Sequence, residues 1–182
     1  MRASLRHGMT PMELEQRLAG KGSAPEPHLA LSQEPSSHAS SSSGRPMAVF
    51  YGSNSGTCEA LAQRVATDAP RNDFRATSLA PLDSANQNVP KDRPVVIITA
   101  SYEGQPPSNA ALFVAWMESL VGQEMDGLSY AVFGCGHHDW VQTFQRVPRL
   151  VDSTLEKLGG SRIMPLATTD AADRDMFSDF ET

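Results

Sequence analysis

The sequence predicts an α/β fold in which helices cover both faces of a five-stranded parallel sheet. From Pro46 onward, short apolar segments with the composition of strands alternate with segments whose apolar residues recur at helical spacing. Strands that are joined through helices run parallel, and the helices then cover both faces of the sheet. A chain of 182 residues with 40% hydrophobic content suits one such domain with some additional chain.

The first part of this pattern contains three expected strands and two expected helices. The run Val95–Ala100 is continuous and rich in β-branched residues, which is typical of a central strand in a parallel sheet. Leu61, Ala62 and Val65 indicate a helix at 59–69, of which they form the buried side. The other expected elements are strands at 47–51 and 74–79 and a helix at 110–121.

The second part of the pattern supplies two more strands and two more helices. We expect a strand at 129–133, a helix at 145–158 that ends at the pair Gly159-Gly160, and a fifth strand at 162–166. A final helix should follow, but it has barely begun at Thr182. The sequence therefore predicts a doubly wound sheet whose final helix is truncated.

The N-terminal part of the chain has a different composition. Residues 21–45 are rich in Ser and Pro and contain little that could be buried, so we expect a flexible linker there. Before the linker, Thr10 and Pro11 can begin one short helix that runs to Leu18. We therefore place the folded domain at 46–182.

Composition excludes several functional classes. The net charge of −6 disfavours nucleic acid and anionic membrane surfaces as partners. No apolar run is long enough for membrane insertion and the first residues do not resemble a signal peptide, so we expect a cytoplasmic location. Cys58 and Cys135 are too few for a disulfide framework or a structural zinc site, and a solvated loop is the simplest interpretation of His137-His138, so we expect no metal.

The loop after the first expected strand has the chemistry of a phosphate site. Ser53, Asn54, Ser55, Gly56 and Thr57 offer hydroxyl groups, an amide and the free N–H groups of a helix start, and none of them is cationic. The loop matches neither the P-loop pattern nor the dinucleotide-binding glycine pattern. It suits a single terminal phosphate, although many turns between a strand and a helix use the same residues only for capping.

Two further loops each place one aromatic residue at the same edge of the sheet. Tyr102 follows the third expected strand, within the segment 99–109, and Trp140 follows the fourth, within 134–140. Ligands bind at the carboxyl edge of an open parallel sheet, and a flat ligand between the two rings would explain both residues. Trp116, in contrast, lies on an expected helix and suits core packing.

Three motifs together resemble the FMN-binding, flavodoxin-like domain of diflavin reductases. They are Tyr-Gly-Ser-Asn-Ser-Gly-Thr at 51–57, Thr-Ala-Ser-Tyr-x-Gly-x-Pro-Pro-x-Asn at 99–109 and Val-Phe-Gly-Cys-Gly-x-x-x-Trp at 132–140. The resemblance spans residues 46 to about 180 and is greatest to the fungal fused cytochrome P450–NADPH reductase fatty-acid hydroxylases. Residues 1–20 resemble the end of the haem domain in that family, which would make them a remnant of it.

The resemblance implies FMN as the cofactor and assigns a role to each loop. It gives the phosphate to Ser53, Asn54, Ser55, Gly56 and Thr57, and the isoalloxazine ring to Tyr102 and Trp140. It places the backbone of Ser101, Glu103 and Gly104 at N5 and O4 of the ring, and Gly134, Cys135 and Gly136 along its polar edge. No side chain would be catalytic, because the redox chemistry belongs to the cofactor.

The resemblance also implies the partners. The expected function is relay of electrons from an FAD/NADPH reductase domain to a P450 haem domain, both of them in cis in a parent protein, and the chain should not be active alone. Two alternatives remain open from the sequence: a free-standing flavodoxin that serves a separate redox partner, and a truncated fragment that binds no cofactor.

Overall fold

The computed structural model describes residues 43–136 and 143–170, all of them within the compact unit Ser41–Thr182. Several sequence predictions lie outside the described residues. They are the haem-domain remnant at 1–20, most of the linker, the stacking residue Trp140 and the final helix after residue 170.

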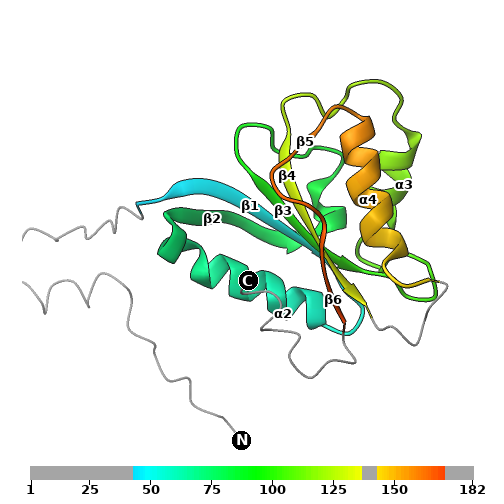
Figure 1. Ribbon diagram of the computed structural model, residues 1–182, viewed down its shortest axis with the longest axis horizontal. Helices are drawn as coiled ribbons and strands as arrows, with labels where there is room; N and C mark the ends of the chain where they lie inside the picture. The colour runs from blue at the N-terminus through cyan, green and yellow to red at the C-terminus, as the bar shows by residue number, and fades with distance from the viewer. Residues whose placement is uncertain (1–42, 137–142, 171–182) are drawn as a thin grey trace, which may run out of the picture. The chain divides into compact units, whose positions relative to one another are not determined.

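The described residues form a parallel sheet with five strand positions. The strand order is β2-β1-β3-β4-β5, and β6 also pairs with β4, so β5 and β6 share the fifth position (Figure 1). This confirms the predicted doubly wound sheet. The strands are β1 (Arg45–Gly52), β2 (Phe74–Pro81), β3 (Val95–Ala100), β4 (Ser129–Gly136), β5 (Ser161–Arg162) and β6 (Ala167–Asp170).

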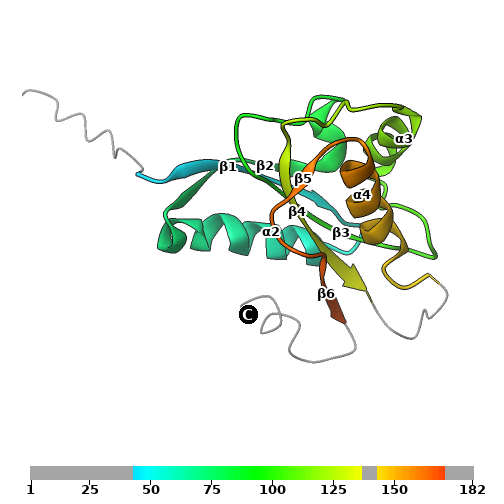
Figure 2. The same ribbon diagram turned by 45° about the horizontal axis from the view of Figure 1, so that its top comes forward.

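Helices cover both faces of this sheet, as predicted. The helix α2 (Thr57–Asp68) lies on one face, and α3 (Ala111–Ser119) and α4 (Arg146–Lys157) lie on the other (Figures 1 and 2). Two short 3-10 helices, Ala69–Asn72 and Leu82–Ala85, follow α2 and β2. In the ranges that the structure describes, no helix has the length and apolar character needed to cross a membrane.

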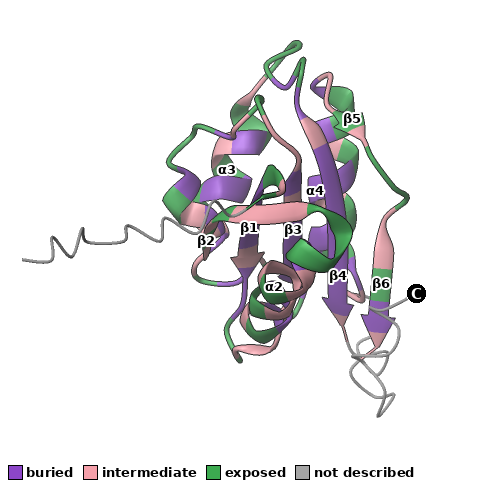
Figure 3. Ribbon diagram, turned by 90° about the vertical axis from the view of Figure 1, so that its left-hand side faces the viewer, coloured by how far each residue is buried: buried purple, intermediate pink, exposed green. Residues whose placement is uncertain are grey.

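A separate apolar core lies on each face. The core beneath α3 and α4 includes Phe113, Met117 and Leu155, and the core beneath α2 includes Val49 and Leu61. Strands β3 and β4 are buried along nearly their whole length, because side chains of both faces are covered (Figure 3).

The prediction of one fifth strand at 162–166 is wrong. Pairing with β4 begins at Ser161 and Arg162, stops, and resumes at Ala167. In this unpaired gap, the fifth strand position contains two more residues than the facing part of β4. Pro165 lies in this gap and has no N–H to donate to a neighbouring strand. Ile163 and Met164 are about half exposed there, at 55% and 49%.

A network of polar groups joins β5 and β4 to α4. Both the Nε and the Nη2 of Arg162 donate to the Asp152 carboxylate, at 2.9 and 2.8 Å, and Arg162 also donates twice to Glu156. The buried phenol of Tyr130 donates to the backbone oxygen of Asp152 at 2.8 Å. Burial, together with the negative charge of Asp152, raises the pKa of Tyr130 to about 12.

The raised pKa of Tyr130 predicts a loss of stability in alkali. The folded-state pKa lies above the ordinary value of 10.0, so this contribution is complete below about pH 10 and is lost as the pH rises toward about 12. We expect the free energy of unfolding to fall over that interval by at most about 2–3 kcal/mol more in the wild type than in Tyr130→Phe. Urea unfolding of both proteins at pH 9 and pH 11.5 measures the difference, and equal losses would contradict the assignment.

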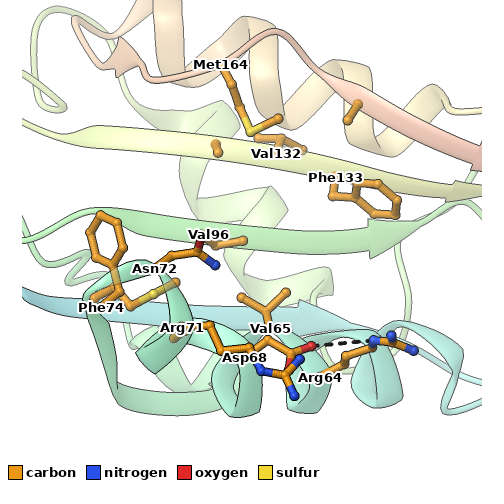
Figure 4. A pocket seen from close by; sticks show the side chains of 14 residues that line it. Arg64, Val65, Asp68, Arg71, Asn72, Phe74, Val96, Val132, Phe133 and Met164 are labelled. Carbon is orange, nitrogen blue, oxygen red and sulfur yellow. Dashed lines mark ion pairs between the residues drawn. The ribbon is translucent and has the colours of Figure 1, made fainter. Parts of the chain in front are cut away.

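The face that carries α2 also holds an open apolar groove of about 570 Å³. Val65 and Phe74 line one side, and Phe133 and Met164 line the other (Figure 4). An ion pair between Arg64 and Asp68, 3.6 Å long, lies on the α2 side of the groove (Figure 4). Among the described residues, α2 therefore covers only part of this face.

Candidate functional site

The three loops that the sequence singled out begin at the carboxyl edge of the sheet. Gly52 of β1 is in register with Thr99 of β3, and Thr99 is in register with Gly134 of β4. The loops that follow these residues therefore begin side by side. The chain also changes direction across the sheet between β1 and β3, which is where ligands bind in open parallel sheets.

In the first loop, several hydrogen-bonding groups converge on one oxygen atom. The backbone N–H groups of Asn54 and Ser55 both donate to the phenolic oxygen of Tyr102, each at 3.2 Å. The Ser55 hydroxyl lies 3.0 Å from the same oxygen and 3.2 Å from the Thr57 hydroxyl. Two amides and a hydroxyl thus form a cradle for one oxygen atom at the start of α2.

The shape of this loop is fixed by its own side chains. The Ser53 hydroxyl accepts a hydrogen bond from the Gly56 N–H at 3.0 Å, which closes the turn. Gly56 precedes the first residue of α2 and has φ of +85°, a left-handed conformation that favours glycine. The turn therefore directs the amides of Asn54 and Ser55 to the same side.

Two residues that the sequence interpretation did not include in the site tie the first loop to the second. The Asn109 side-chain oxygen accepts the Ser53 N–H at 2.9 Å. The Asn54 side-chain oxygen accepts from both the N–H and the hydroxyl of Ser108, at 2.8 and 3.0 Å. These contacts join residues that are 56 and 54 positions apart in the sequence, so no local pattern signalled them.

The second loop carries Tyr102 on a tight two-residue turn. Tyr102 and Gln105 exchange two backbone hydrogen bonds, of 3.0 and 2.9 Å, around Glu103 and Gly104. Both central residues have positive φ, at 51° and 79°, as the tightest hairpin turns require. The turn is anchored to α4, because the Ser101 hydroxyl accepts the Val147 N–H at 2.8 Å.

The third loop depends on a buried glutamine. The Gln145 side-chain amide is fully buried and donates to the backbone oxygens of Gly134 and Thr169, at 3.1 and 3.2 Å. A Cβ atom at Gly134 would collide with the Gln145 side-chain oxygen, and one at Gly136 would lie 2.7 Å from its nitrogen. Both glycines are thus required by close packing. The sequence interpretation placed Gln145 only at a helix start, and its burial had no signal in the local pattern.

The two cysteines lie beneath these loops and are buried in the same core. Contact with the Cys58 thiol, and then burial, raises the pKa of Cys135 far above its ordinary range. Cys135 is therefore a neutral thiol and a poor nucleophile at physiological pH. The described part of the chain contains no cluster of three His, Cys, Asp or Glu residues that could hold a metal ion. His137 and His138 lie outside it.

The cradle offers the kind of donors that a terminal phosphate group requires. The phenolic oxygen of Tyr102 occupies the position where two amides and a hydroxyl meet. Ser53 to Thr57, Ser101 to Gly104 and Gly134 to Gly136 are brought to one edge; Trp140 lies outside the described residues.

Comparisons with known proteins agree with this geometry. A family model described as Flavodoxin matches residues 49–182. The bifunctional cytochrome P450/NADPH–P450 reductase of Fusarium oxysporum is 63% identical over 179 residues, which are 98% of this chain and 17% of that protein. A self-sufficient cytochrome P450 monooxygenase of Aspergillus niger is 46% identical over 184 residues, again with 17% of its length covered. The chain therefore spans about a sixth of the length of these relatives.

Solved structures give the same fold. A C101S mutant of flavodoxin from Pseudomonas aeruginosa matches with a TM-score of 0.62 and 24% identity, over 75% of this chain and 91% of that one. Oxidised flavodoxin 1 from Bacillus cereus matches with a TM-score of 0.58 and 15% identity, over 75% and 92%. With the family model covering most of the sequence, the chain belongs to the flavodoxin family, and its cofactor is FMN.

Proposed function

We propose that this chain is an FMN-binding electron-transfer domain that relays electrons from an FAD/NADPH reductase domain to a P450 haem domain. The observation that carries the proposal is the convergence of two loop amides and a hydroxyl on one oxygen position, at the sheet edge where three loops meet. The names of the relatives supply the partners, since those proteins combine a P450 with an NADPH–P450 reductase. This similarity favours the relay over a free-standing flavodoxin.

The residues at the edge take separate roles in this proposal. The loop 53–57 holds the phosphate with neutral donors, and Tyr102 and Trp140 flank the isoalloxazine ring. The backbone of Ser101, Glu103 and Gly104 faces the reactive edge of the ring, and residues 134–136 line its polar edge. A cytoplasmic location stays a prediction from the sequence.

The chemistry of the proposed relay divides between cofactor and protein. Bound FMN would supply the ability to accept and release electrons one at a time. The chain binds and orients it: Gly56 and Ser53 shape the phosphate loop, and Ser101 fixes the 102–105 turn to α4. The described side chains at this edge offer hydrogen bonds and aromatic surface, and the proposal assigns none of them a covalent step.

The proposal is tested by removing one phosphate donor. Hydrogen bonds to a charged group are worth roughly 1.5–3 kcal/mol, so Thr57→Ala should weaken FMN binding about tenfold or more and leave riboflavin binding unchanged. Thr67→Ala is a matched control, because its hydroxyl donates to the Gln63 backbone oxygen within α2 and does not reach the loop. Titration of cofactor-free protein, followed by quenching of flavin fluorescence, gives both dissociation constants.

Two outcomes would count against the proposal. Equal affinity of the wild type for riboflavin and FMN would remove the phosphate role of the loop. Failure of the wild type to bind either flavin, with the fold intact by circular dichroism, would support the alternative of a fragment that binds no cofactor.

A further inference from the structure

We propose that the Tyr102 hydroxyl is a built-in competitor for the phosphate position, which lowers the apparent affinity of the cradle for any phosphate group. The inference rests on the proposed function and adds a competing role for Tyr102. In the structure the phenolic oxygen occupies the cradle that the loop amides form. A phosphate must displace it before it can bind there.

The contacts of the phenolic oxygen match those expected of a phosphate oxygen. It accepts two N–H groups, from Asn54 and Ser55, and it exchanges a hydrogen bond with the Ser55 hydroxyl. These residues lie 47 and 48 positions away from Tyr102 in the sequence, so the contact is a tertiary one between two loops. The cradle is thereby already assembled around an oxygen atom that belongs to the protein.

The contacts of the phenolic oxygen are weak enough for a phosphate to displace it reversibly. Both N–H bonds measure 3.2 Å, at the long end of the normal range, and the acceptor is a neutral phenol. A phosphate oxygen carries negative charge, and charge-assisted hydrogen bonds are roughly twice as strong as neutral ones. An anion can therefore displace the phenol, but its apparent affinity is its intrinsic affinity multiplied by the fraction of protein in which the cradle is open.

A flavin nucleotide regains part of the affinity that is lost in displacing the phenol, and inorganic phosphate does not. When the phenol leaves the cradle, its ring needs a new apolar surface, and a flavin ring at the same edge provides one. Tyr102 is half-buried, and its turn is held by backbone bonds to Gln105, so its side chain can rotate without unfolding the loop. The displaced tyrosine thus strengthens the binding of ligands that carry both a ring and a phosphate.

The test uses Tyr102→Phe, which keeps the ring and removes the competing oxygen. Inorganic phosphate is titrated against FMN, and its inhibition constant is obtained from flavin fluorescence. Loss of a neutral hydrogen-bonded competitor should lower that constant about three- to tenfold relative to the wild type. Tyr51→Phe is the matched control and should leave the constant unchanged, because the Tyr51 hydroxyl faces Glu59 rather than the loop.

A second measurement follows wild-type protein directly and does not require FMN. In wild-type protein labelled with 13C at the tyrosine Cζ, inorganic phosphate should shift the Tyr102 resonance as the phenol leaves the cradle. The Tyr102 resonance can be assigned by its absence in Tyr102→Phe, or in Tyr102→Trp if that variant folds better.

The outcomes separate this inference from the proposed function. An inhibition constant that stays the same or rises in Tyr102→Phe would overturn the inference, because the hydroxyl would then be a bystander or a phosphate ligand. An equal decrease in Tyr51→Phe, or an unshifted Tyr102 resonance at saturating phosphate, would also overturn it. If the wild type fails to bind FMN at all, the proposed function fails, whereas the phosphate titration by resonance shift still reports on Tyr102.

Discussion

Protein loaded with FMN should not oxidise NADPH by itself. The sequence contains no glycine-rich dinucleotide loop, and the described sheet edge forms one phosphate cradle. We therefore expect no entry for electrons from a nicotinamide cofactor. The measurement is the loss of NADPH absorbance with and without an added FAD/NADPH reductase domain. Oxidation by the isolated chain would overturn the relay and would require a hydride-accepting site elsewhere.

Adding an FAD/NADPH domain and a P450 haem domain in trans should restore slow electron flow. Residues from Met47 onward contain ten basic and seventeen acidic residues, so the rate should fall with added salt if the partner surfaces are basic. A tether typically gives an effective concentration of about millimolar, so at micromolar protein the rate should lie well below that of a fused protein. A rate that does not depend on the concentration of the added domains would contradict the relay.

Gly134→Ala should disrupt the site more than its small size suggests. The added methyl group would meet the Gln145 side-chain oxygen and lie 2.8 Å from Pro148 Cβ, so β4 and the start of α4 must separate. Overpacking of this kind destabilises by roughly 1–3 kcal/mol, and the displaced loop should also weaken FMN binding by about tenfold or more. Urea unfolding and flavin titration measure the two effects.

Gly127→Ala is the control for this substitution. Gly127 has φ of +81° and nothing within 4 Å of an added Cβ, so its replacement strains only the local backbone. We expect a loss of roughly 1–2 kcal/mol in stability with FMN affinity unchanged. If both variants lose stability equally and neither loses FMN affinity, the packing of Gln145 on the third loop does not support the site.

Local pattern was sufficient to predict most of the sheet. The expected strand Val95–Ala100 matches β3, and Gly159 after α4 has the positive φ of a helix end. Alternation within β1 also agrees with two covered faces, since Val49 points into one core and Phe50 into the other. These features depend on neighbouring residues, which is the information that a single sequence carries.

Features that depend on distant residues were not predictable in this way. The break between β5 and β6 is set by the register of each with β4, and within 162–166 only Pro165 was a signal against a continuous strand. The contact of Tyr102 with Asn54 and Ser55 joins two loops that only the finished sheet brings together. The loops and their residue types were predicted, but which groups face one another was not.

The phosphate cradle has no positive charge, so it does not neutralise the charge of its ligand. The loop 53–57 contains no Lys or Arg. A bound phosphate ester would therefore add about 1.5 to 2 negative charges to the part of the chain from Met47 onward, whose own net charge is −7. The loaded domain would then project a stronger negative potential than the empty one. A basic partner surface would attract loaded copies over empty ones before any contact forms, and native electrophoresis would separate the two populations.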